Sequence, residues 1–165
     1  MKKILMSLVL MILLSNFSIE AKRYRFVIKN SYETEIVRVG KKGEKYICVI
    51  GEAGSVSNAM DMAMQNAVAA CLFTGVEGNA HAGRIPAICD SSEAYELNKK
   101  YFDTFFKKGE FMNYVKNINS GYPSGANNVR VGLKRKVRLW VIVHYDALRE
   151  KMENDGVVKS LDVYF

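Results

Sequence analysis

The stretch VRVGLKRKVRLWVIVHY, residues 129–145, has the most regular pattern in the sequence. Aliphatic residues stand at its odd positions from Val131 to Val143, with Arg135 as the single exception. Side chains of a β-strand point alternately to its two faces, so a period of two predicts one long strand with one buried face, bent near Gly132. The other face would carry Arg130, Lys134, Lys136, Arg138, Trp140, Ile142 and His144.

Further strands are predicted nearer the N-terminus. Residues 35–39 and 45–50 are rich in β-branched and aromatic side chains and flank residues 40–43, Gly-Lys-Lys-Gly, which is typical of a hairpin turn. We expect the glycines of residues 51–54 to end the second strand. Residues 24–29 mix apolar with basic side chains and are expected to form an edge strand.

A helix is predicted to follow, beginning with Ser57 or Asn58 as its cap and ending near Thr74. Gly75 then occupies the position after the helix end, where glycine is common. Spacings of three and four residues favour a helix that lies close to a sheet through a stripe of small side chains: Ala59, Ala63, Ala67 and Ala70.

Two more helices are expected in the C-terminal half. Residues 90–93, Asp-Ser-Ser-Glu, have the form of a capping box and precede a helix that ends near Gly109. Its inward stripe would consist of Leu97, Tyr101 and Phe105. The sequence also predicts a short strand or a last helical turn at residues 111–115, a helix that begins at Asp146, has Leu148 and Met152 inward and ends at Gly156, and a closing strand at residues 161–165.

Composition agrees with this order of elements. The chain has 165 residues, of which 49% are hydrophobic and 25% charged, and a formal net charge of +7. Those values are ordinary for a globular domain and exclude a coiled coil, a collagen-like repeat or a disordered tail. We therefore predict a single α+β domain over residues 22–165, with a mainly antiparallel sheet and about three helices packed on one face.

Residues 1–21 predict export. Lys2 and Lys3 precede an apolar run at residues 4–14, and a more polar stretch then leads to Ala21, the expected cleavage position. The alternative, an uncleaved membrane anchor, is weaker because a bilayer span needs about 20 apolar residues. No cysteine lies near the junction for lipid attachment, and no later run is long enough for a span. The expected location is the bacterial periplasm or the medium.

Three cysteines allow three disulfide pairings in an oxidising compartment. Cys71 and Cys89 would close the shortest loop and are the first choice, which would leave Cys48 as a thiol. The alternative is that all three are small, buried, apolar side chains.

No catalytic pattern is evident, so we expect neither an enzyme nor a bound cofactor or metal. Residues 51–54 lie between a strand and a helix but lack the lysine of a phosphate-binding P-loop. The cysteines have none of the close pairs typical of zinc sites. His81 could meet a cysteine across the loop at residues 75–89, although no flanking motif supports a cysteine nucleophile.

The basic face of residues 130–140 is the leading candidate for binding. On one strand face, Lys134, Lys136 and Arg138 would be spaced about 6–7 Å apart, with Arg130 and Trp140 continuing the row. Such a row could dock on an acidic protein, anionic lipid or a glycan; nucleic acid is disfavoured by export and by the lack of a recognition motif. The alternative is a solvated face whose charges deter pairing of strand edges.

Three segments together resemble the FlgT-type N-terminal domain and a related family of small bacterial outer-membrane lipoproteins. They are residues 46–53 (YICVIGEA), the alanine-striped helix ending at Gly75, and the strand of residues 136–145 leading into Leu148-Arg149. The resemblance spans residues 44–158. It implies a non-catalytic envelope protein that serves assembly or adhesion through protein contacts, and it supplies no catalytic residues.

The function expected from the sequence is therefore that of an exported, non-catalytic cell-envelope protein that acts by protein–protein binding or self-association. The alternative is a small-ligand or glycan binder, or an enzyme, that uses the loop at residues 75–89 with His81 and Arg84.

Overall fold

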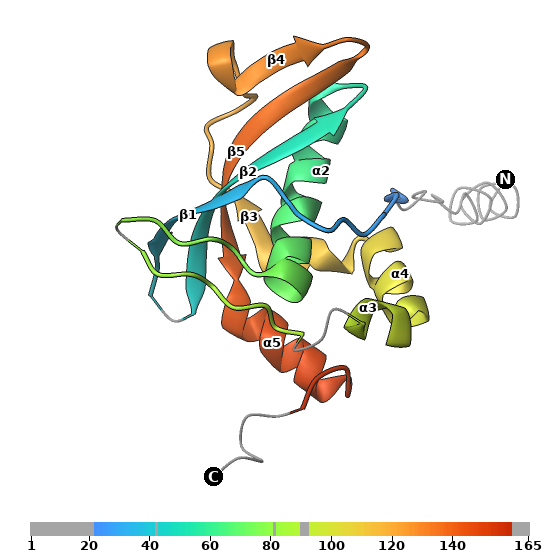
Figure 1. Ribbon diagram of the computed structural model, residues 1–165. Coiled ribbons are helices and arrows are strands. Elements are labelled where there is room, and N and C mark those ends of the chain that lie inside the picture. The colour runs from blue at the N-terminus through green and yellow to red at the C-terminus, as the bar shows by residue number, and fades with distance from the viewer. Residues whose placement is uncertain (1–21, 42, 81, 90–92, 160–165) are drawn as a thin grey trace, which may run out of the picture.

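The computed structural model describes residues 22–41, 43–80, 82–89 and 93–159. The predicted signal peptide, His81, the first three residues of the capping box and the predicted strand at residues 161–165 lie outside these ranges. Within them the elements are, in chain order, β1 (Thr34–Val39), β2 (Glu44–Ala53), α2 (Val56–Ala69), the π-helical turn η1 (Ala70–Thr74), α3 (Ala94–Leu97), α4 (Lys99–Lys107), the 3-10 turn η2 (Glu110–Tyr114), β3 (Val115–Asn117), the 3-10 turn η3 (Gly125–Asn127), β4 (Asn128–Val131), β5 (Lys134–His144) and α5 (Tyr145–Asn154) (Figure 1).

The fold is α+β, as predicted. In the described part of the chain, five strands form one sheet in the order β1-β2-β5-β3, with β4 also paired to β5, and every pairing is antiparallel. Helix α2 lies along one face of the sheet, while α3, α4 and α5 gather at the end of the molecule opposite the β4–β5 hairpin (Figure 1). The core lies between α2 and the sheet.

Gly51 does not break β2, contrary to the sequence prediction, because the strand continues through it to Ala53. Gly51 instead allows the backbones of β2 and α2 to approach each other closely. A Cβ atom built at Gly51 would lie 2.1 Å from the Ala59 carbonyl oxygen and 2.4 Å from the Ala63 nitrogen. The glycine therefore lets the backbone of α2 rest directly on β2.

Helix α2 has the predicted alanine stripe, and its four members are fully buried. Its cap is Ser55 rather than Ser57 or Asn58, since the Asn58 backbone N–H donates to the Ser55 hydroxyl at 3.2 Å. The chain leaves the helix through η1 at Gly75, which has φ of +74°. The predicted helix is thus correct in place and in its buried face.

Residues 24–29 form no strand, and the prediction of an edge strand there is wrong. Instead Phe26 is buried with its ring stacked on Phe106, their centroids 3.8 Å apart, and the Tyr24 N–H donates to the Lys107 carbonyl at 3.2 Å. The rings of Tyr24 and Phe26 thus pack on aromatic side chains from several elements, Phe111 of η2 and Phe106 of α4 among them.

The helix predicted to end near Gly109 is divided into α3 and α4 at Asn98. The division rotates Leu97 away from the expected inward stripe, and it is 77% exposed. Phe102, Phe105 and Phe106 are buried in the core cluster. Residues 111–115, for which the sequence predicts either a short strand or a last helical turn, belong mainly to η2. Strand β3 begins at the last of them.

Residues 129–145 are not one bent strand but a hairpin followed by a helix. Val131 pairs with Lys134, so the chain reverses through the two-residue turn Gly132-Leu133, where Gly132 has φ of +59°. Positive φ at the first turn residue is typical of tight β-hairpins. Strand β5 passes directly into α5, which buries Leu148 and Met152 as predicted.

Candidate functional site

The register of β2 and β5 separates a covered face from an open face of the sheet. Val137, Leu139, Val141 and Val143 are fully buried on the side covered by α2. The alternate residues of β5 stand on the other side, where Trp140 is opposite Cys48, Arg138 opposite Ile50, and Lys136 opposite Glu52. The described elements place no helix over this second side, which we call the open face.

A groove of about 550 Å³ lies on the open face, where β1, β2 and β5 run side by side. Trp140 and Cys48 are half-buried within it, and Arg138 is exposed beside them. The residues that line the groove are Glu33, Thr34, Glu35, Val37, Cys48, Ile50, Asn79, Arg138 and Trp140.

Two of the predicted basic residues are already paired with carboxylates. Lys134 Nζ lies 3.2 Å from Glu52, and Lys136 Nζ lies 2.8 Å from Glu33. Both pairs are largely exposed, so each contributes little to stability, but each reduces the positive charge that a partner would meet. The row is therefore less basic than its sequence suggests.

Arg138 differs from these lysines, since no ion pair to it is found among the residues that the structure describes. Burial raises the pKa of the nearby Cys48 thiol; the positive charge of Arg138 opposes this rise, and Glu35 adds to it. The Cys48 thiol is thus kept protonated at neutral pH. An exposed guanidinium beside an indole and a neutral thiol suits recognition of a carboxylate or an aromatic side chain.

Arg130 is not part of the predicted row, and this is a correction. Because β4 and β5 form a hairpin, Arg130 is directly opposite Arg135, on the side that faces α2. The open-face positions of β4 are taken by Val129 and Val131 instead. The structure therefore brings Lys134, Lys136, Arg138 and Trp140 to one face and puts Arg130 on the other.

Trp140 is held by hydrogen bonds of its backbone to the segment after β3. Its N–H donates to the Asn119 side-chain oxygen at 2.8 Å, and its carbonyl accepts from the Ile118 N–H at 3.0 Å. These bonds fix the backbone of β5 at Trp140, whose side chain lines the groove. Trp and Arg are the residue types most enriched at the centres of protein interfaces.

Asn79 is a groove residue that the sequence analysis missed. Its side-chain amide donates to the Ile36 carbonyl at 2.6 Å and so ties the loop after α2 to β1. The two residues are 43 positions apart in the chain. No local pattern around Asn79 marks this contact, because it arises only once the loop folds back over the strand.

The loop at residues 75–89, the alternative site, is held by hydrogen bonds. The Tyr145 hydroxyl donates to the Pro86 carbonyl at 2.9 Å. Arg84 donates to the Thr74 carbonyl at 3.4 Å and lies 3.8 Å from Glu77 in an exposed ion pair. A shallow hollow of about 350 Å³ is lined by Thr74, Arg84, Pro86, Ala87 and Cys89. Of the two proposed ligand residues, the structure describes Arg84 only.

The segments that contain Cys71 and Cys89 lie side by side. The Ile88 N–H donates to the Cys71 carbonyl, and the Cys89 N–H donates to the Leu72 carbonyl, each at 2.9 Å. Cys71 is a free thiol in the structure, and complete burial raises its pKa to about 12. A thiol of such high pKa is a poor nucleophile, which argues against Cys71 as a catalytic group.

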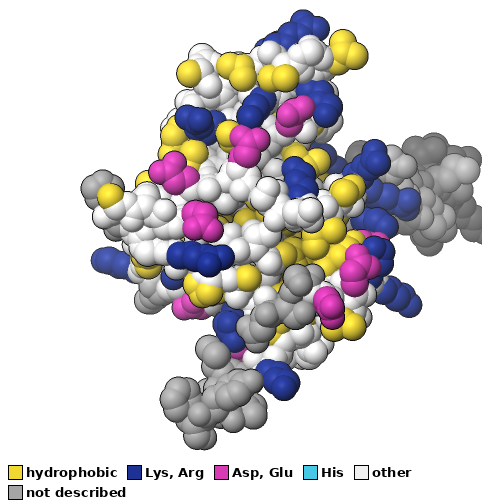
Figure 2. Space-filling view, in the orientation of Figure 1, with side chains coloured by type: hydrophobic (Ala, Val, Ile, Leu, Met, Phe, Trp, Pro, Cys, Tyr) yellow, Lys and Arg dark blue, Asp and Glu magenta, His cyan; other side chains and the backbone are white. Residues whose placement is uncertain are grey.

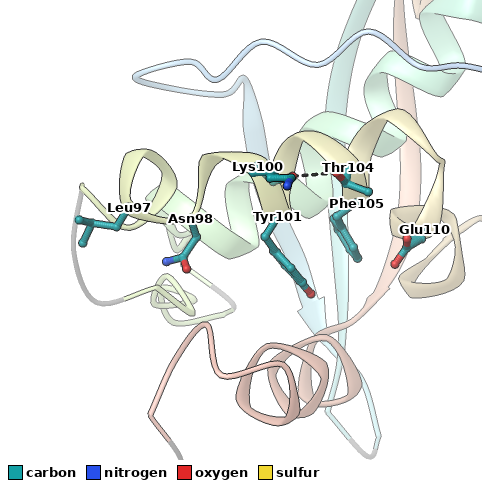
Figure 3. Close-up of a pocket in the computed structure, with 7 residues that line it drawn as sticks. All are labelled: Leu97, Asn98, Lys100, Tyr101, Thr104, Phe105 and Glu110. Atoms are coloured by element: carbon teal, nitrogen blue, oxygen red, sulfur yellow. Dashed lines mark hydrogen bonds between the residues drawn. The ribbon is translucent and has the colours of Figure 1, made fainter.

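A second hollow, of about 520 Å³, lies along α3 and α4 (Figure 3). Tyr101, Phe105 and Glu110 point from this side toward α5, as Figure 3 shows. The Tyr101 hydroxyl donates to the Asp155 carboxylate at 2.5 Å, and burial and this contact raise the tyrosine pKa. The contact joins α4 to the residue that follows α5, so we interpret it as structural.

Neither a metal centre nor a membrane span is found in the described part of the chain. No three His, Cys, Asp or Glu side chains there are grouped closely enough to hold a metal ion. The described helices are also too short or too polar to cross a bilayer. Comparison of the chain with protein-family models, with curated proteins and with solved structures finds no match.

Proposed function

We propose that this protein is an exported, non-catalytic component of the bacterial cell envelope that binds another protein through the groove on the open face. The observation that carries the proposal is the juxtaposition of Trp140 and Arg138 in a groove on the open face of the sheet. Export and periplasmic or secreted location rest on residues 1–21, and the envelope role also agrees with the FlgT-type resemblance.

The form of the groove favours a protein partner. Its walls combine the aliphatic side chains of Val37 and Ile50 with the indole of Trp140 and the guanidinium of Arg138, and aromatic residues and arginine are enriched at protein interfaces. Edge strand β1 is not freely available for strand addition, because its register shifts between Ile36 and Arg38 and Asn79 occupies the Ile36 carbonyl. We therefore expect the partner to insert side chains into the groove rather than extend the sheet.

The experiment is affinity capture from the native host after light cross-linking and solubilisation in detergent. Trp140→Ala and Arg138→Gln should each greatly reduce recovery of the partner, because truncation of a central aromatic or arginine often weakens an interface by about 2 kcal/mol or more. Arg25→Gln is the matched control, since it removes one exposed arginine from the segment before β1, outside the groove. Circular dichroism and thermal melting check that each variant is folded.

Neutral substitutions are preferable to charge reversal at Lys134 and Lys136. A glutamate at either position would stand beside Glu52 or Glu33, and repulsion there could disturb the sheet itself. If both groove variants capture the same protein as the unmodified chain, the groove is not the binding site. Recovery of only a second copy of this chain, lost in both variants, would identify self-association.

A further inference from the structure

The β4–β5 hairpin presents aliphatic side chains to solvent at one end of the molecule (Figure 1). Leu133, in the turn, is 90% exposed, and Val129 and Val131 are 43% and 47% exposed. Figure 2 shows hydrophobic and basic side chains close together at that end. Single exposed aliphatic residues are common on surfaces, but a tight turn with an apolar tip and apolar flank is not explained by packing within this fold.

Basic side chains surround this tip on both sides of the hairpin. Lys134 shares the open face with Val131, whereas Arg130 and Arg135 are directly opposite each other on the other side. Like charges at directly opposed positions destabilise a strand pair. In the described residues no carboxylate is paired with either arginine; Arg130 donates only to the Gly132 carbonyl, at 3.1 Å. An anion bound beside this pair would offset the repulsion between the two like charges.

We propose that this hairpin, residues 128–137, docks on the surface of an anionic lipid bilayer. Leu133 and Val131 enter the boundary between headgroups and acyl chains, and Arg130 and Arg135 bind headgroup phosphates. Lys134, whose Nζ lies 3.2 Å from Glu52, is not required for this docking. This docking uses residues other than Trp140 and Arg138, so it stands independently of the proposed protein-binding groove.

The backbone of the hairpin suits entry into this boundary. Polar backbone groups must be paired where water is scarce, and β4 and β5 pair with each other from Asn128–Val137 to Val131–Lys134. Two residues of strand span about 7 Å, which matches the depth of about 5–10 Å at which peripheral apolar faces lie. The arginine side chains at the second pair behind the turn, Arg130 and Arg135, are long enough to remain among the phosphates.

The same features disfavour the other anionic partner, a nucleic acid. Phosphates of nucleic acid would bind the cations but would leave the aliphatic tip in water. The described hairpin also has no aromatic side chain on which a base could stack. A bilayer accounts for the cations and the aliphatic side chains together.

The test is sedimentation with vesicles of phosphatidylglycerol and phosphatidylethanolamine, compared with vesicles of phosphatidylcholine alone. The chain is used as purified from its host, and mass spectrometry establishes that all variants share one N-terminus, so any lipid binding by residues 1–21 is common to them. We expect binding to the anionic vesicles that weakens as salt rises from about 0.1 M to about 1 M.

The first variant removes the apolar tip. Leu133→Ser should weaken binding to anionic vesicles about ten-fold or more, because a leucine side chain leaves the apolar layer. Leu97→Ser is the matched control: it changes another leucine, 77% exposed on α3, and should bind as the unmodified chain does. Equal binding by the Leu133 and Leu97 variants would overturn the proposal.

The second variant, Arg130→Gln/Arg135→Gln, removes the opposed arginines. Each basic side chain near an anionic surface strengthens binding about five-fold, so the double variant should bind about 25-fold more weakly. Lys99→Gln/Lys100→Gln, on α4, removes the same charge elsewhere and should have little effect. If the arginine variant loses binding to a DNA oligonucleotide but not to vesicles, or if inorganic phosphate abolishes vesicle binding at ionic strength held constant, the lipid surface is the wrong ligand.

Discussion

Substitution of Gly51 by alanine tests the contact on which this fold depends. The new Cβ atom would lie 2.1 Å from the Ala59 carbonyl oxygen, 2.4 Å from the Ala63 nitrogen and 2.8 Å from the Ala63 Cα. All three atoms are helix backbone and cannot rotate away as a side chain could. An ordinary contact of 3.4 Å would require α2 to move from β2 by about 1.3 Å at its nearest point.

The displacement would loosen the whole packed layer between helix and sheet. Ala59, Ala63 and Ala67 are fully buried, so a shift of α2 opens space along its length. Overpacking of this kind usually costs about 1–3 kcal/mol, and contacts with backbone place Gly51→Ala at or above the upper end. Such a loss is a large share of the roughly 5–15 kcal/mol by which a domain is stable.

Urea unfolding followed by circular dichroism measures this loss. Gly54→Ala is the control, because a Cβ atom there meets nothing within 4 Å; we expect its free energy of unfolding to be unchanged or slightly raised. If Gly51→Ala and Gly54→Ala unfold at the same urea concentration, α2 does not rest on β2 as closely as the structure shows, and the reasoning fails.

Three further predictions concern stability and the cysteines. The Lys151 ammonium, by its hydrogen bond, lowers the pKa of Asp155, so Asp155→Asn should lower the urea midpoint at pH 7. A lowered pKa means that the folded state is stabilised only while Asp155 is ionised. The difference in urea midpoint between Asp155→Asn and the unmodified chain should therefore vanish as pH falls from about 5 through that pKa. Gln65 is 3% exposed and its side-chain nitrogen has no hydrogen-bond partner among the described residues, so Gln65→Met should raise the free energy of unfolding by about 1 kcal/mol, and a fall in the urea midpoint would contradict this. The pairing of Cys71 with Cys89 in the exported protein predicts one cross-linked peptide pair in a non-reducing digest, and alkylation of all three cysteines in the unfolded chain would exclude it.

Sequence periodicity was sufficient for elements whose pattern is repeated and local. The alanine stripe of α2, the aliphatic face of β5 and the inward pair Leu148 and Met152 are all buried as predicted. In each case burial on one face is strong enough to determine both the element and its orientation. The α+β class follows from these elements.

Errors arose where one residue has two possible structural roles. Glycine commonly ends a strand, but at Gly51 it permits close packing within one, and only the position of α2 distinguishes the two roles. The segment at residues 24–29 has strand-like composition, yet Phe26 is buried with its ring stacked on Phe106 and the segment does not join the sheet. Asn98 interrupts a helical pattern that the sequence continues, and so Leu97 faces solvent.

The alternation of apolar and polar residues in residues 129–145 continues through the turn at Gly132-Leu133, so the sequence pattern did not indicate a hairpin. Side chains alternate along each strand, and a two-residue turn does not interrupt the alternation of residue types in the sequence. The turn nevertheless reverses the strand, so residues of equal parity on β4 and β5 face opposite sides: Arg130 is opposite Arg135, and Val131 opposite Lys134. A row of cations predicted as one binding surface thus becomes two surfaces, an arginine pair beside an apolar tip and a groove around Arg138. The Trp140→Ala and Leu133→Ser variants are informative for this reason, since the first affects the groove and the second affects the hairpin tip.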